Sequence, residues 1–258
     1  MRIDVISWIA KRKQILKDKG LKRTLLIIQV GDNPASNAYI KGKIKDCLEI
    51  GYDVERWNYE NGVDAERIVK DIKAERDKFD GIILQEPADI VGDKEAITYA
   101  ICDWQDVDGF RRDSQHSPCT PLGIMELLAE IRGTKNLRGQ IVTIVGRGKL
   151  VGRPLIDMMA DAGATIIACN SATPDLGCMT LMADIVIMAT GARDLLLPHM
   201  VKEGAIIIDA GISVDEDGKL HGDAHKNLYD DPKVLITTVP GGVGLVTRLM
   251  LLENLSRS

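Results

Sequence analysis

The sequence predicts an α/β protein of two lobes, each built on a parallel sheet. Short apolar runs rich in isoleucine and valine, such as 24–30 and 141–145, alternate along the chain with longer helix-like segments. Strands that are apolar on both faces are typical of parallel sheets covered by helices on both sides. The length of 258 residues is sufficient for two ordinary domains, each with its own core.

The first half of the chain alternates between helices and strands. We expect a helix over 5–19 that ends at Gly20, and then a buried strand over 24–30 followed by the turn Gly-Asp-Asn-Pro. The remaining elements predicted in this half are a helix over 35–50 that ends at Gly51, a strand over 53–59, a charged amphipathic helix over 65–79 and a strand over 81–85.

The second half repeats the alternation more clearly. Four strands are predicted over 141–145, 165–169, 184–189 and 205–209. Helices are predicted over 123–131, after the break Pro-Cys-Thr-Pro, over 153–162, and over 245–255 at the end. We expect the last helix to return to the first lobe. The domains would then be 1–121 plus 241–258, and a Rossmann-type domain over 122–240.

Composition excludes several classes of protein. The net charge of -5 and the pI near 5.5 give no overall attraction to nucleic acid or to an anionic membrane. Five scattered cysteines show no CxxC spacing and no zinc-like cluster with histidine, so we expect no metal site and reduced thiols. No apolar run approaches the roughly 20 residues that span a bilayer, and early charges argue against a signal peptide. We expect a cytoplasmic protein.

A glycine-rich loop joins the strand 141–145 to the helix that follows. Gly146, Gly148 and Gly152 have the spacing GxGxxxG, one residue longer than the usual dinucleotide fingerprint. The first glycine permits a tight turn, the second lets the backbone approach a pyrophosphate, and the third permits close packing of the helix. The helix N-terminus would then face the phosphates. The alternative is a glycine turn in an α/β domain that binds no nucleotide.

The end of the next strand indicates which dinucleotide binds. An NAD site usually has an acidic residue there, but this chain reads Cys169-Asn-Ser171-Ala, without a carboxylate until Asp175. Arg147 lies in the glycine loop, where a guanidinium suits a 2′-phosphate. NADP is therefore favoured over NAD, although a solvated loop would also explain Arg147 and Ser171. The cofactor-binding residues predicted are Gly146, Arg147, Gly148, Val151, Gly152, Ser171 and Ile212.

A second candidate site lies on the predicted helix 35–50. Ser36, Tyr39 and Lys43 are spaced i, i+3 and i+7 and therefore share one face. A tyrosine and a lysine beside a ligand can stack on a flat ring and transfer a proton. By spacing alone, however, such a pair is more often a solvated surface feature.

Four further segments occur in a fixed order around these two motifs: Gly-Ile-Ile-Leu-Gln-Glu-Pro over 81–87, Asp-Val-Asp-Gly-Phe over 106–110, Pro-Cys-Thr-Pro-Leu-Gly over 118–123 and Pro-Gly-Gly-Val-Gly over 240–244. Together the ordered set resembles the bifunctional methylenetetrahydrofolate dehydrogenase/methenyltetrahydrofolate cyclohydrolase family over nearly the whole chain. The resemblance implies a homodimer in one-carbon metabolism, with tetrahydrofolate derivatives bound between two α/β lobes. It also implies oxidation of 5,10-methylenetetrahydrofolate with NADP and hydrolysis of the methenyl product to 10-formyltetrahydrofolate.

The resemblance also implies residue roles. Lys43 would be the catalytic lysine and Tyr39 the ring that stacks on the folate. Gln85 would hydrogen-bond near Lys43, and Asp108 would hold the pterin. The loop containing Pro240, Gly241 and Gly242 would shape the folate side of the site.

These residue types suit the chemistry. Hydride leaves a carbon flanked by two nitrogens, so the product is a delocalised cation that needs orientation more than acid catalysis. Hydrolysis then needs water activated against that cation and a proton returned to nitrogen. A lysine can serve once burial or a neighbouring cation lowers its pKa.

The chain also departs from the usual family pattern. Glu86-Pro-Ala-Asp stands where the family usually has Leu-Pro-Leu-Pro, Gln105 replaces a common lysine, Gly148 a serine and Leu245 a proline. The segment between Phe110 and Pro118 is also short. If Glu86 points toward Lys43, its charge would hold the lysine protonated and weaken it as a base.

Three alternatives to the bifunctional enzyme stay open. One is a folate dehydrogenase without the hydrolytic step. Another is an NADP oxidoreductase of shikimate-dehydrogenase-like plan, and the last is a dinucleotide sensor without turnover.

Overall fold

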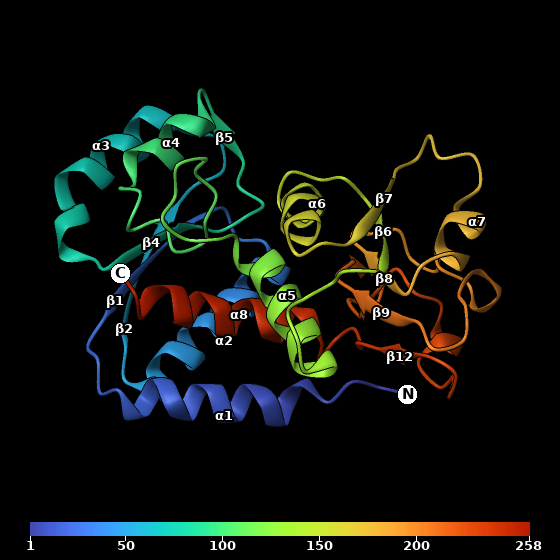
Figure 1. Ribbon diagram of the computed structural model, residues 1–258. Coiled ribbons are helices and arrows are strands. Elements are labelled where there is room, and N and C mark those ends of the chain that lie inside the picture. Colours follow the sequence, from blue (N-terminus) through green and yellow to red (C-terminus); the bar gives the residue numbers. More distant parts are fainter. The chain divides into compact units, whose positions relative to one another are not determined.

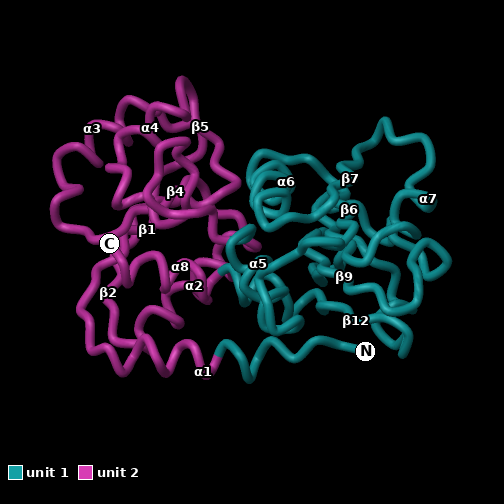
Figure 2. Tube along the Cα trace, in the orientation of Figure 1, with its two compact units in different colours: residues 1–9, 120–247 teal, residues 10–119, 248–258 magenta.

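The computed structural model describes residues 1–258, and the chain divides into two compact units (Figure 2). One unit, here called the dinucleotide unit, comprises Met1–Ile9 and Thr120–Thr247. The other, the lysine unit, comprises Ala10–Cys119 and Arg248–Ser258. The first helix α1 (Val5–Asp18), the connecting helix α5 (Cys119–Arg132) and the last helix α8 (Val243–Leu255) each contribute residues to both units.

The lysine unit is built on a three-stranded parallel sheet in the order β2-β1-β4 (Figure 1). In the register of this sheet, Leu25 of β1 pairs with Val54 of β2 and Gly81 of β4. A small parallel ladder joins β3 and β5. The elements of the unit after α1 are β1 (Thr24–Val30), α2 (Pro34–Ile50), β2 (Asp53–Tyr59), β3 (Val63–Asp64), α3 (Ala65–Glu75), the 3-10 turn η1 (Arg76–Lys78), β4 (Gly81–Leu84), β5 (Ile90–Val91) and α4 (Lys94–Ala100).

The core of the lysine unit lies between the sheet and helices α3 and α4. Ile28 of β1, Ile68 and Ile72 of α3 and Ile97 of α4 are fully buried in one apolar cluster. Such burial contributes about 1.5–3 kcal/mol for each large aliphatic side chain. Since β1 is the central strand and is apolar on both faces, it anchors the helices on either side of it.

Helix α2 is fixed at both ends by its sequence. The Asn33 side chain accepts hydrogen bonds from the backbone N–H groups of Ala35 and Ser36, and Pro34 occupies the first turn. At the other end Gly51 adopts a left-handed conformation (φ 89°), which a glycine allows without steric cost. A side-chain cap of this kind is worth about 1 kcal/mol, so the face that carries Lys43 is presented by a well-defined helix.

The C-terminal half of α8 packs within the lysine unit. Arg248 Nε lies 2.8 Å from Asp46 Oδ2 of α2 in an ion pair, and Lys13 Nζ of α1 lies 2.6 Å from the other Asp46 oxygen. Asn254 donates hydrogen bonds to the carbonyl oxygens of Val107 (2.9 Å) and Ser117 (3.1 Å). The last helix therefore returns to the first part of the chain and ties α1, α2 and the 107–117 loop together.

The dinucleotide unit contains a five-stranded parallel sheet in the order β12-β9-β8-β6-β7. The order reverses between β6 and β8, because β7 lies on one side of β6 and the later strands on the other. Its elements are α5, β6 (Ile141–Val145), α6 (Gly152–Asp161), β7 (Thr165–Cys169), α7 (Leu176–Leu181), β8 (Ile185–Met188), the 3-10 turn η2 (Pro198–Met200), β9 (Ile206–Asp209), the hairpin strands β10 (Ser213–Val214) and β11 (Leu220–His221), η3 (Lys226–Leu228), β12 (Leu235–Ile236) and α8.

All the predicted strands and helices are present, with differences at their ends. The predicted helix 65–79 ends as α3 at Glu75 and continues as η1. Helix α5 begins at Cys119, four residues earlier than predicted, and includes Pro121 in its first turn, where proline is tolerated because its missing N–H would have no helical partner. The short elements α4, α7 and β12 were not predicted. No helix of the structure is both long and apolar enough to cross a membrane.

Candidate active site and dinucleotide site

Lys43 is buried in the lysine unit on the inner face of α2. Only 4% of its side chain is exposed, and its Nζ lies 3.8 Å from Asp108 Oδ2. The same nitrogen lies 5.1 Å from the centre of the Tyr39 ring, within the range of a cation–π contact. The structure thus brings together three of the four residues predicted for catalysis. A lysine so deeply buried is rare unless it is paired, and here the carboxylate and the aromatic ring are its partners.

Asp108 is held by a tightly folded loop. Gly109 has φ 72°, and a Cβ at this position would lie 2.6 Å from the backbone of Ser117 and Pro118. The Asp108 carbonyl accepts the backbone N–H of Cys119 (3.3 Å), whose buried thiol donates to Val107 O. Burial, assisted by the nearby Asp108 charge, raises the pKa of the Cys119 thiol well above its usual range. This thiol is therefore a packing group beside the site.

Gln85 follows β4 and is 7% exposed. Its backbone N–H donates to Ile28 O (2.8 Å) of the central strand, and its side-chain Nε2 donates to Glu86 O (2.7 Å). The Gln85 Oε1 oxygen is buried without a hydrogen-bond partner. A buried acceptor left unsatisfied costs about 1–3 kcal/mol, so a hydrogen-bond donor brought to this oxygen would stabilise it.

Glu86 points toward α4. Its Oε2 lies 2.6 Å from Lys94 Nζ and accepts the backbone N–H of Ala88 (3.1 Å). The condition under which Glu86 would weaken Lys43 as a base is not met, because the carboxylate is paired with Lys94. The peptide bond between Glu86 and Pro87 is cis.

The loop containing Pro240, Gly241 and Gly242 lies in the dinucleotide unit, directly before α8. The Val239–Pro240 peptide bond is cis, and Gly241 has φ 100°. A Cβ on Gly242 would lie 2.4 Å from Thr238 O, so this position accepts only glycine without a backbone shift. The loop has one narrowly defined shape.

The glycine-rich loop has the geometry that phosphate binding requires. Gly146 has φ 101°, and a Cβ there would lie 2.3 Å from Ala189 O. A Cβ on Gly152 would lie 1.9 Å from Gly146 O, whereas one on Gly148 would meet nothing within 4 Å. Val151 precedes α6 and provides no side-chain cap to the helix N-terminus. The Arg153 N–H already donates to Gly148 O (3.0 Å), but Gly148 adjoins open space, so the loop has room for the pyrophosphate of a dinucleotide.

A hollow of about 790 Å³ adjoins this loop. It is lined by Arg147, Arg153, Ile156, Asp157, Ala168 and Asn170. Arg153, in the first turn of α6, was not predicted as a site residue, although its position directly after the third glycine could have suggested it. Two guanidinium groups on one hollow at the ends of β6 and β7 suit a phosphate on the adenosine ribose. Ser171 is exposed just beyond β7, and Ile212 is exposed after β9.

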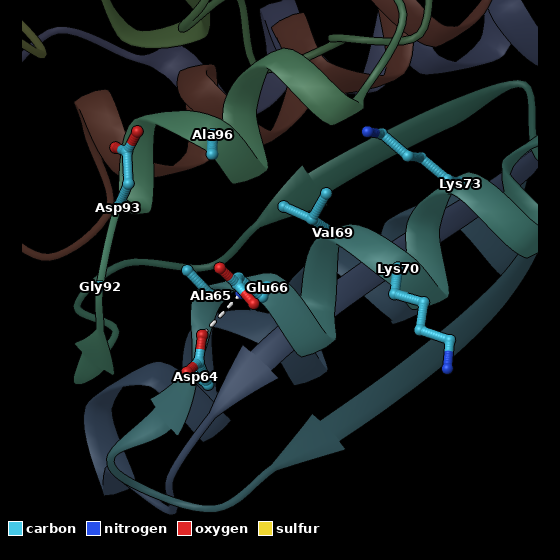
Figure 3. Close-up of a pocket in the computed structure, with 9 residues that line it drawn as sticks. All are labelled: Asp64, Ala65, Glu66, Val69, Lys70, Lys73, Gly92, Asp93 and Ala96. Carbon is cyan, nitrogen blue, oxygen red and sulfur yellow. Dashed lines mark hydrogen bonds between the residues drawn. The ribbon is translucent and has the colours of Figure 1, made fainter.

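A second hollow, of about 620 Å³, lies between α3 and α4 (Figure 3). Its lining residues are Asp64, Ala65, Glu66, Val69, Lys70, Lys73, Gly92, Asp93 and Ala96. Asp64 and Asp93 are the N-caps of the two helices. None of the predicted site residues lies here. Since both aspartates already cap helices, we assign no catalytic role to this hollow.

Sequence comparison identifies relatives of both units. The family profile described as tetrahydrofolate dehydrogenase/cyclohydrolase, catalytic domain, matches residues 3–108, and the profile for the NAD(P)-binding domain matches residues 118–258. This chain belongs to the tetrahydrofolate dehydrogenase/cyclohydrolase family.

Individual relatives agree with the profiles. The bifunctional protein FolD of Acidovorax sp. (strain JS42) is 37% identical over 257 residues, covering 95% of this chain and 91% of the relative. Among solved structures, the FolD methylenetetrahydrofolate dehydrogenase/cyclohydrolase of Campylobacter jejuni superposes with a TM-score of 0.91 at 37% identity, over 99% of this chain and 97% of that one. The Trypanosoma brucei FolD, complexed with NADP cofactor and an inhibitor, has a TM-score of 0.89 at 28% identity over 99% and 95%.

These matches confirm the family resemblance and the two-domain α/β fold predicted from the sequence. They also confirm the enzyme class, a tetrahydrofolate dehydrogenase/cyclohydrolase with an NAD(P)-binding domain. The alternative of a shikimate-dehydrogenase-like oxidoreductase is therefore set aside for this chain.

Proposed function

We propose that this chain oxidises 5,10-methylenetetrahydrofolate to the 5,10-methenyl cation with NADP and then hydrolyses that cation to 10-formyltetrahydrofolate. The observation that carries the proposal is the group formed in the lysine unit by the buried Lys43 and Asp108 and the half-buried Tyr39. A bound folate offers a flat ring for Tyr39 and polar ring edges for Asp108. It also offers a reacting carbon between two nitrogens, where a lysine can move a proton.

Lys43 is the residue to which we assign proton transfer. In the hydrolytic step water adds to the carbon between the two nitrogens, one carbon–nitrogen bond breaks, and a proton leaves the attacking oxygen. An amine held beside this carbon can take that proton and return one to the released nitrogen. Asp108, at 3.8 Å, restrains the Lys43 Nζ and is in our proposal also the group that orients the pterin.

Tyr39 and Gln85 complete this proposal. The Tyr39 ring lies beside the lysine nitrogen, so a folate stacked on the ring would have its reacting carbon within reach of Lys43. The unpartnered Gln85 Oε1 would accept a hydrogen bond when the site is occupied. The loop of Pro240, Gly241 and Gly242 would also bind the folate, as the family resemblance implies.

NADP would supply the hydride acceptor of the first step. In the dinucleotide unit, Gly146, Gly148, Val151 and Gly152 would contact the pyrophosphate, and Arg147 the 2′-phosphate. Ser171 would contact the adenosine half and Ile212 the nicotinamide half. The two arginines that line the hollow, with no acidic residue at the end of β7, favour NADP over NAD.

We further propose that the chain works as a homodimer in the cytoplasm, as the family resemblance implies. Light scattering on the purified protein would test the first part of this statement, since a dimer has twice the mass of the 28.3 kDa chain.

The proposed reactions can be followed together by absorbance. Purified protein is mixed with 5,10-methylenetetrahydrofolate and NADP, and NADPH and the methenyl compound are recorded in the same sample. If NADPH forms without methenyl accumulation, both steps are present. If methenyl accumulates with NADPH, the chain is a dehydrogenase without the second step. Absence of both products with NADP and with NAD would refute the proposed activity.

A further inference from the structure

Two aspartates of the dinucleotide unit are completely buried, although neither belongs to the sites described above. Asp209 ends β9, Asp223 follows β11, and both have 0% exposure. Burying a carboxylate is costly unless hydrogen bonds compensate for the lost water. Asp209 accepts backbone N–H groups from Gly211 (3.1 Å), Asp223 (3.1 Å) and Ala224 (2.9 Å), so its carboxylate joins the ends of β9 and β11.

Asp223 continues this connection to the next strand. One of its oxygens, Oδ2, accepts both the backbone N–H and the hydroxyl of Thr190, each at 2.7 Å. Thr190 lies just beyond β8, and its hydroxyl also accepts the N–H of Ala192 (3.1 Å). Hydrogen bonds to a charged acceptor are about twice as strong as neutral ones. Asp223 therefore fixes the start of the loop 189–192.

The other Asp223 oxygen has no hydrogen-bond partner and faces the loop after β9. A Cβ on Gly211 would lie 2.0 Å from this oxygen, so the carboxylate packs directly on the glycine backbone. The same carboxylate thus contacts the loops that follow two neighbouring strands, β8 and β9.

The loop that Asp223 holds contacts two predicted cofactor positions. A Cβ on Gly146 would lie 2.3 Å from Ala189 O and 3.2 Å from the Thr190 Cγ2 methyl, so the glycine loop rests on this segment. A Cβ on Gly191 would lie 3.2 Å from Ile212 O. A shift of the loop 189–192 would therefore displace both the Gly146 turn and the Ile212 backbone.

The topology indicates which part of a dinucleotide lies over these loops. In a doubly wound sheet the dinucleotide crosses the carboxyl ends of the strands where the strand order reverses, with one mononucleotide on each side. Here the reversal lies between β6 and β8. In the proposed function, the arginine-lined hollow beside β7 takes the adenosine half. The nicotinamide half therefore falls on the side of β8 and β9, where Asp223 acts.

We propose that Asp223 is a positioning residue for the nicotinamide half of NADP, acting through Thr190 on the loop 189–192 and through Gly211 on the backbone of Ile212. This inference rests on the proposed function. It names the residues of the fold that would hold the hydride-accepting ring in place.

Binding measurements separate the two halves of the cofactor. Asp223→Asn keeps the shape but removes the charge. Thr190→Val removes the hydroxyl, which donates to Asp223 and accepts from Ala192, and Thr190→Ser retains it. For Asp223→Asn and Thr190→Val, calorimetry should show NADP binding weakened about tenfold, because one charge-assisted hydrogen bond is lost. Binding of adenosine 2′,5′-bisphosphate, which lacks the nicotinamide half, should stay within about twofold. Thr190→Ser should bind NADP as the unmodified chain does.

Kinetics supply a second, independent readout. With Asp223→Asn the dehydrogenase kcat should fall about tenfold or more, while hydrolysis of the methenyl compound measured without NADP should be unchanged. Asp217→Asn, in an exposed turn of the same unit, is the matched control. Equal weakening of both nucleotides, parallel loss of both activities, or no change in NADP binding would each overturn the proposal. If the unmodified chain neither binds NADP nor turns over, it is the proposed function that has failed.

Discussion

The lysine unit and the dinucleotide unit build their sites in different ways. Around Lys43 the chemistry is in side chains, a lysine, a tyrosine and an aspartate brought together from α2 and a loop more than sixty residues later along the chain. At the dinucleotide site the main chain forms the cradle, and Gly146 and Gly152 matter because any side chain there would collide with a carbonyl oxygen. Substitutions around Lys43 should therefore lower catalytic rates. Substitutions in the glycine loop should instead distort the backbone that binds the cofactor.

The largest expected effect is in the lysine unit. Lys43→Ala should lower hydrolysis of the methenyl compound by at least about a hundredfold, the usual range for loss of a general acid or base. The measurement is the decay of methenyl absorbance without NADP. Lys45→Ala, an exposed lysine on the same helix, should leave the rate unchanged. Full hydrolysis by the Lys43→Ala protein would exclude this residue from the reaction.

A smaller but still clear effect is expected from the shape of the glycine loop. Gly152→Ala places a methyl group 1.9 Å from Gly146 O, and overpacking of this kind costs about 1–3 kcal/mol. We expect a melting temperature lower by about 2–4 °C per kcal/mol, together with loss of NADP binding. Gly148→Ala meets open space, so its melting temperature should stay unchanged. Equal melting temperatures for the two variants would contradict this geometry.

The contrast also explains what the sequence could predict. Main-chain features have local signals. Strand β1 is a mostly apolar run, α2 starts at Asn33-Pro and stops at Gly51, and the glycine loop has a recognisable spacing. Helix α4 escaped prediction because seven residues are too short for a clear period.

Side-chain partners were harder to foresee. Whether Glu86 meets Lys43 or Lys94 depends on the path of the chain after β4, and spacing along the sequence does not determine that path. Asp209 and Asp223 are fourteen residues apart and meet only because β9 and the segment after β11 converge. The spacing identified Tyr39 and Lys43 as neighbours on one helix face, but the ordered motifs were needed to favour a site over a solvated surface.

Cofactor choice tests the side-chain part of the dinucleotide site. Arg147→Ala should raise the KM for NADP about tenfold, which corresponds to a loss of about 1.4 kcal/mol of binding free energy. The KM for NAD should be unaltered, because only NADP carries the 2′-phosphate. Lys149→Ala removes the same charge from the same loop without lining the hollow, so it should change neither value by more than about twofold. A rise in both KM values with Arg147→Ala would show that the arginine holds the pyrophosphate instead.

The smallest effect concerns pH and the buried carboxylates. Burial, which outweighs three backbone hydrogen bonds and is assisted by the Asp223 charge, raises the pKa of Asp209 to about 6. In the unfolded chain this carboxyl titrates near its ordinary value of 3.8. Between these two values the folded protein binds a proton that the unfolded chain does not. This group therefore stabilises the fold less as pH rises through about 6, by about 1 kcal/mol between pH 5 and pH 7.

The surface carboxylates act in the opposite sense at lower pH. Hydrogen bonds lower the pKa values of Asp175 and Asp215, so their contributions are lost only as pH falls below about 4. Comparing urea unfolding of the unmodified chain with Asp209→Asn at pH 5 and pH 7 isolates the buried group. The difference between the two pH values should be smaller in the variant by about 1 kcal/mol. If both proteins show the same difference, Asp209 does not titrate between pH 5 and pH 7.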